Sequence, residues 1–168
     1  MKGKYAILWV LLLISFYGCS DKKTITDTLH RAEALMNEYP DSAYTLLQTL
    51  PVDKLHQDKN RARYALLYSQ ALDKNYIDET NDSLINIAVD YYRTTDDVHS
   101  KFLAFYYQGR VYTNAGESVK AMQAYTEADQ LADGVKDGYL LGLLYAELGK
   151  IYRLYYDYPK SLDAYQNQ

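Results

Sequence analysis

The side chains in this sequence that could carry out chemistry are three histidines, a single cysteine and several clustered acids. His30, His56 and His99 lie far apart along the chain, whereas metal-binding histidines usually recur at short intervals. The acids of Asp78–Asp82 and Asp96–Asp97 stand directly before expected helices, where carboxylates stabilise the positive end of the helix dipole. No serine lies in a nucleophile elbow, and no glycine-rich loop could cradle a phosphate. The sequence therefore predicts no enzyme, no metal site and no cofactor.

The only cysteine, Cys19, follows a short apolar segment near the N-terminus. That segment runs from Tyr5 to Phe16 behind two lysines, which is the order of charged and apolar residues in a secretory signal. Its 12 residues fall short of the roughly 20 that cross a bilayer as a helix. A lone cysteine forms no internal disulfide, so an exported chain leaves this thiol for another use.

Gly18 and Cys19 resemble the end of a bacterial lipoprotein signal, which is cut just before a cysteine that carries lipid. The resemblance implies a signal peptide over residues 1–18, acylation of Cys19 and a tether over residues 19–23. The alternative is an ordinary or uncleaved signal with an incidental cysteine. Ser20, where sorting rules sometimes read a retention aspartate, favours the outer over the inner membrane. We expect a lipid-anchored protein in the cell envelope of a Gram-negative bacterium.

The composition favours a single all-α domain. The 168-residue chain has only three prolines, lacks strand-like alternation and is rich in helix-forming residues. Its formal net charge of −4 becomes −6 without residues 1–18, which carry two lysines and no acid. Because nucleic acids attract basic surfaces, this charge argues against a nucleic-acid partner.

Two segments near the C-terminus repeat one another at a distance of 40 residues. The matched pairs are Phe105 with Tyr145, Gly109 with Gly149, Tyr112 with Tyr152, and Tyr125 with Tyr165. Phe105, Gly109 and Tyr112 fall on one face of a helix. Ala121, Tyr125 and Ala128 fall on one face of the following helix. The small residue at Gly109 would let the two helices approach, with the ring of Tyr125 filling the space beside it.

This pattern resembles the tetratricopeptide repeat (TPR), a helix–turn–helix unit of about 34 residues. Five residues stand where that motif has glycine, tyrosine, alanine, an aromatic residue and alanine: Gly109, Tyr112, Ala121, Tyr125 and Ala128. The resemblance covers residues 104–168 best and weakens towards the N-terminus. It implies an all-α, short right-handed superhelix of antiparallel helix hairpins.

The expected hairpins span residues 24–50, 60–94, 98–132 and 136–168, so that repeats occupy residues 24–168. Their helices are expected near residues 24–38, 41–50, 60–74, 82–94, 98–114, 117–132, 136–155 and 159–168. The last unit is incomplete at Gln168. Because solenoids usually end in a polar capping element, either a longer product, a partner or a second copy is expected to cover it.

One set of cations is a candidate binding site. In the TPR family the first helix of each hairpin lines the concave surface, and the resemblance places Tyr106, Arg110, Lys150 and Arg153 there. Arg110 and Lys150 hold the same place in successive repeats. Cations gathered in an acidic chain suggest a protein or peptide partner with an acidic segment or a chain-end carboxylate. The alternative is solvated charge paired with neighbouring acids such as Glu147.

The sequence as a whole indicates a membrane-anchored scaffold that binds proteins or peptides and catalyses nothing. Two alternatives stay open. The chain could be the N-terminal sensing part of a longer TPR signalling or transcription-regulating protein. It could also be a surface lipoprotein that binds glycans, with Tyr106 and other members of its 20 tyrosines stacking on sugars.

Overall fold

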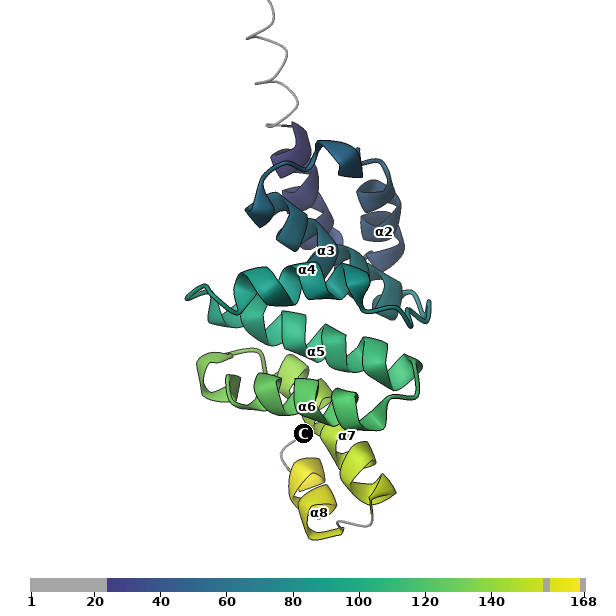
Figure 1. Ribbon diagram of the computed structural model, residues 1–168, viewed down its shortest axis with the longest axis vertical. Coiled ribbons are helices and arrows are strands. Elements are labelled where there is room, and N and C mark those ends of the chain that lie inside the picture. Colours follow the sequence, from purple (N-terminus) through teal and green to yellow (C-terminus); the bar gives the residue numbers. More distant parts are fainter. Residues whose placement is uncertain (1–23, 156–157, 167–168) are drawn as a thin grey trace, which may run out of the picture.

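The computed structural model describes residues 24–155 and 158–166, in which every regular element is helical (Figure 1). A first helix covers residues 24–35. It is followed by α2 (Pro40–Gln48), α3 (Asp58–Lys74), α4 (Ser83–Tyr92), α5 (Val98–Asn114), α6 (Ser118–Asp129), α7 (Gly138–Leu154) and α8 (Tyr158–Gln166), with short 3₁₀ helices at Val52–Lys54 and Ala132–Gly134. The all-α prediction is confirmed for these residues. The expected signal peptide, its cleavage at Gly18 and the lipid attachment at Cys19 lie outside them.

The helices pack as sequential hairpins. Within hairpins, α3 packs on α4, α5 on α6, and α7 on α8. Between hairpins, α2 meets α3, α4 meets α5, α6 meets α7, and the two first helices α3 and α5 also touch. The hairpins consequently follow one another along the long axis of the molecule (Figure 1).

Local hydrogen bonding explains where several helices begin and end. Asp97 caps α5, because its carboxylate accepts from the backbone N–H of Ser100 at 3.0 Å. Asp137 caps α7 in the same way, accepting from two backbone N–H groups. At the end of α5, Gly116 adopts a positive φ of 75°. This left-handed residue lets the N–H of Glu117 bond the carbonyl of Tyr112 at 2.9 Å and stop the helix.

Two asparagines, one at the end of α3 and one at the end of α5, each hydrogen-bond to the hairpin that precedes their own. Asn75, directly after α3, donates from Nδ2 to the carbonyl of Pro40 at 2.9 Å. Asn114, the last residue of α5, donates from Nδ2 to the carbonyl of Glu79 at 3.2 Å. These bonds fix neighbouring turns together, and they add a polar link to the apolar contacts between hairpins.

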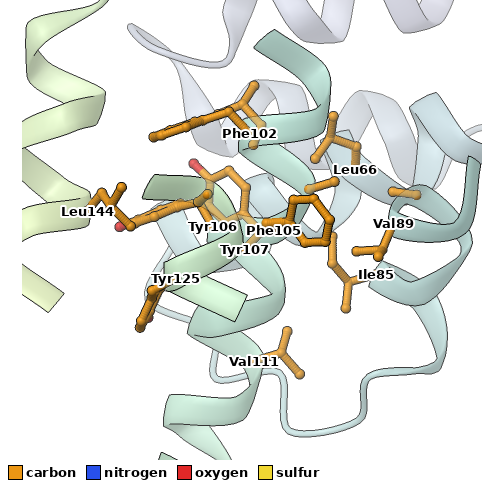
Figure 2. Packing of buried hydrophobic residues seen from close by; sticks show 14 of the residues in the cluster. Leu66, Ile85, Val89, Phe102, Phe105, Tyr106, Tyr107, Val111, Tyr125 and Leu144 are labelled. Carbon is orange, nitrogen blue, oxygen red and sulfur yellow. The ribbon is translucent and has the colours of Figure 1, made fainter. Parts of the chain in front are cut away.

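The larger of two apolar clusters is centred on α5. Figure 2 shows the aromatic side chains of α5 lying between Ile85 and Val89 on one side and Leu144 on the other. The smaller cluster joins helix 24–35 to α2 and α3 through residues such as Leu29 and Leu47, both fully buried. Each helix therefore buries one apolar face against the next element in sequence.

The 40-residue repetition reappears as a repeated packing contact. A Cβ atom on Gly109 would lie only 2.3 Å from Cε1 of Tyr125, whose ring is fully buried. A Cβ atom on Gly149 would lie 2.8 Å from Cε1 of Tyr165. In both hairpins a ring on the second helix thus fills the space over a glycine on the first.

The other residues of the repeat also pack as neighbours. Phe105, Ala121 and Ala128 are buried, and Tyr112, Tyr145 and Tyr152 pack half-buried against the same cluster. The ammonium of Lys120 lies 5.3 Å from the ring centre of Tyr112. The ammonium of Lys160 lies 5.7 Å from that of Tyr152. Cations lie over aromatic rings at the same place in both hairpins.

Candidate binding groove

Arg110 and Lys150 belong to a ladder of charges that crosses three helices. Arg110 on α5 donates from Nε to Oδ1 of Asp73 on α3 at 2.7 Å. It also donates from Nη1 to Oε1 of Glu147 on α7 at 3.0 Å. Lys150 donates from Nζ to the same oxygen at 2.8 Å. The first helices of three consecutive hairpins are therefore linked by ion pairs.

Within the ladder, two cations are matched by two carboxylates. Burial lowers the pKa of Arg110, but the hydrogen bond to Asp73 and nearby negative charge more than offset this, so that its pKa is raised. Glu147 is almost fully buried, with its side chain 9% exposed. Arg110 and Lys150 thus neutralise acids of the chain itself. This pairing agrees with the alternative interpretation of these cations, that they form ion pairs with neighbouring acids such as Glu147.

Tyr106 does not lie on an open surface, contrary to the sequence-based expectation. Its side chain is 3% exposed and stacks on Phe102 with the ring planes 3° apart. Its ring centre is 5.9 Å from that of Tyr125. Burial raises the pKa of the Tyr106 hydroxyl. Tyr106 belongs to the larger apolar cluster and is a core residue. Arg153 lies exposed in the last turn of α7.

A groove opens elsewhere, along the first helices of the hairpins. A hollow of about 330 Å³ lies between the end of helix 24–35, most of the length of α3 and the start of α5. A second hollow of about 420 Å³ continues over the end of α3 to the start of α7. Because the two hollows share Asn37, Gln70, His99 and Leu103, they form one groove.

The groove contains three cations, Lys59, Arg63 and Lys74. Arg63 forms an ion pair with Glu33. The ring nitrogens of His30 lie 3.3 and 2.9 Å from Nη1 and Nη2 of Arg63. Lys59 and Lys74 form no ion pair with another described residue.

The acids of the groove are already engaged. Asp97 and Asp137 each cap a helix through backbone N–H groups. Glu33 is held by Arg63. The formal charges of the groove are therefore balanced, and Lys59 and Lys74 are its two cations that make no ion pair with another described residue.

Sequence reasoning treated His30 and His99 as isolated, yet both line this groove. The 40-residue spacing of the repeat could have indicated that His30 belongs to the surface that lines the groove. Counting back from Lys150 and Arg110 in steps of 40 reaches Gln70 and His30, and both lie in the groove. The repeat thus marked the helix face that forms the groove, although Arg110 and Lys150 on that face are paired with acids.

Several kinds of site are absent from the part of the chain that the structure describes. No group of three or more His, Cys, Asp or Glu side chains there is arranged to hold a metal ion. Within the same residues, no helix has the length and hydropathy needed to cross a bilayer. Comparison with protein-family models, curated proteins and solved structures finds no match to this chain.

Proposed function

We propose that this chain is a short TPR-like solenoid that binds a segment of another protein in the groove formed by its first helices. The observation that carries the proposal is the pair of joined hollows, which extends over helix 24–35, α3, α5 and α7. A groove that crosses successive hairpins suits an extended peptide, because each hairpin supplies its own contacts.

Two features support the solenoid interpretation. Hairpins pack in sequence order, and α3 touches α5 directly. The contacts of Gly109 with Tyr125 and Gly149 with Tyr165 recur at the spacing of the TPR-like pattern. A right-handed superhelix with the first helices on its inner surface is consistent with both.

Binding is favoured over catalysis by the contacts of the groove histidines. Both ring nitrogens of His30 lie against the guanidinium of Arg63 rather than being shown to activate a nucleophile. A nucleophile and base within hydrogen-bond reach are what acyl or phosphoryl transfer by such residues would need.

The proposed scaffold is held at the cell envelope by lipid on Cys19, with residues 19–23 as the tether. Intact mass of the membrane-extracted protein tests this. A mature chain beginning at Cys19 and carrying acyl groups is expected, and an unmodified thiol would refute the anchor.

Peptide selection tests binding in the groove. We expect a displayed peptide library to yield ligands of the purified full chain that bind at least about tenfold more weakly to His99→Trp, because the indole would fill the groove. Glu127→Trp, at an exposed position on α6, is the matched control and should bind normally. Failure to select any ligand, or ligands that bind both variants equally, would refute the proposal.

The two alternative functions have less support. The glycan-binding interpretation loses Tyr106, the tyrosine that it named, because the ring of Tyr106 is buried. A sensing role in a longer protein remains compatible with the same groove, since a sensor would also need a ligand site. We therefore retain peptide binding as the proposed activity.

A further inference from the structure

Arg63 and Glu33 form an ion pair between the first two hairpins, and the two partners differ sharply in exposure. The Arg63 side chain is 15% exposed, whereas that of Glu33 is 56% exposed. A largely buried guanidinium requires a carboxylate partner, because an unpaired buried charge is costly. An exposed carboxylate gains little from such a pair, since water solvates it well in either state. Arg63, which also contacts the ring of His30, therefore depends on this ion pair more than Glu33 does.

The surroundings of Arg63 suit a second carboxylate. Lys59 lies one turn earlier on α3 and lines the same hollow. Asp97, the other acid of this hollow, is bonded to the backbone at the start of α5. Among the described residues that line this hollow, Glu33 is the acid that forms an ion pair with Arg63.

We propose that Arg63 recognises an Asp or Glu side chain of an acidic peptide segment, and that Glu33 occupies this place while the groove is empty. Binding is then an exchange of one carboxylate for another, so Arg63 stays paired throughout. Lys59 favours the incoming acid by adding positive charge, and Lys74 extends that charge along the second hollow. This inference rests on the proposed function and specifies its ligand.

The predicted signature is a gain of affinity on removing an acid from the chain. The probe is a peptide of alternating glutamate and alanine, capped at both ends and carrying a neutral fluorophore, with a glutamine version as its partner. Glu33→Gln should tighten binding of the glutamate probe by about two- to fivefold, the range of an exposed ion pair. Arg63→Gln should weaken it by at least about tenfold. The glutamine probe should respond to neither change.

Controls separate recognition from general charge and folding effects. Glu117→Gln removes an acid that pairs with Lys120 on α6, outside the groove, and should leave affinity unchanged. If Arg63→Gln fails to fold by circular dichroism, Lys59→Gln serves as the loss variant and should weaken binding about two- to fivefold.

An unchanged or weakened affinity of folded Glu33→Gln for the glutamate probe would overturn the exchange. Equal binding of the glutamate and glutamine probes would overturn acidic recognition. In either case, neutral peptides selected on the chain and lost with His99→Trp would leave the proposed function standing.

Discussion

Replacing Gly109 with alanine tests the central packing contact of the repeat. The new Cβ would lie 2.3, 2.5 and 2.8 Å from Cε1, Cδ1 and Cζ of Tyr125. Ordinary contacts between carbon atoms are about 3.5–4.0 Å, so the ring would have to move by more than about 1 Å. It has little freedom, because it is fully buried and its hydroxyl lies 3.1 Å from Oγ1 of Thr113.

The magnitude follows from two opposing effects. Alanine is favoured over glycine inside a helix by about 1 kcal/mol. Overpacking a rigid core site costs about 1–3 kcal/mol, and a clash with a fixed ring belongs at the upper end. Gly109→Ala should therefore lower the free energy of unfolding by about 2 kcal/mol, which corresponds to a fall in Tm of about 4–8 °C.

Gly149→Ala is the matched control, because it makes the same change at the same place in the next hairpin. Its Cβ would lie 2.8 Å from Cε1 of Tyr165, a ring that is 38% exposed and free to move. Strain and helix propensity should nearly cancel there, with a net change within about 1 kcal/mol. Urea unfolding followed by far-ultraviolet circular dichroism measures both variants.

Two results would refute this reasoning. One is a Gly109→Ala protein at least as stable as Gly149→Ala. The other is an equal cost of Gly109→Ala in a Tyr125→Leu background, where the shorter side chain should relieve the strain.

Three further changes test other features by urea unfolding. Tyr76 follows α3 with a positive φ of 58° and a side chain 95% exposed, so Tyr76→Gly should raise stability by about 1 kcal/mol; unchanged stability would contradict strain there. Arg110→Met should cost about 2 kcal/mol, because Asp73 loses its ion-pair partner and Glu147, almost fully buried, keeps only Lys150. Exposed Arg153→Met should change stability by less than about 0.5 kcal/mol, and equal effects would argue against the ladder. Burial raises the pKa of Glu79, although the hydrogen bond from Ser69 lowers it. The folded state therefore holds the Glu79 proton more tightly, and its contribution to stability falls as pH rises through that pKa. The Glu79→Gln protein should consequently have a larger free energy of unfolding than the parent at pH 7 and the same free energy of unfolding in acid. A smaller free energy of unfolding at pH 7 would contradict this reasoning.

Helix positions followed closely from the sequence, because the signals that set them are local. The predicted span 98–114 is the observed extent of α5, which begins at the Asp97 cap and ends before Gly116. The predicted helix over 117–132 is instead divided, with α6 ending at Asp129 and a 3₁₀ turn at Ala132–Gly134. Helical periodicity does not distinguish a continuing helix from such a turn.

The binding surface was predicted less well, because it depends on partners far away in sequence. Arg110 bonds Asp73 and Glu147, each 37 residues away, while the repeat register aligns residues 40 apart. Which acid reaches Arg110 is therefore set by how far one hairpin slides and rotates on the next. That offset follows from many side-chain contacts between hairpins, so no single segment of the sequence determines it.

By itself, the sequence determined most of the helix positions, the acid that caps α5 and the pairing of glycine with tyrosine in each repeat. Residues within one or two turns of each other decide helices and caps, through backbone hydrogen bonds and periodic apolar faces. The pairing of glycine with tyrosine joins two helices of one hairpin, and the 40-residue repetition marked it. Only the tertiary structure decided that Tyr106 is buried, that Arg110 is neutralised and that His30, Arg63 and His99 meet in one groove. Burial and charge pairing depend on what lies across the gap between hairpins, and that is settled only when the hairpins stack.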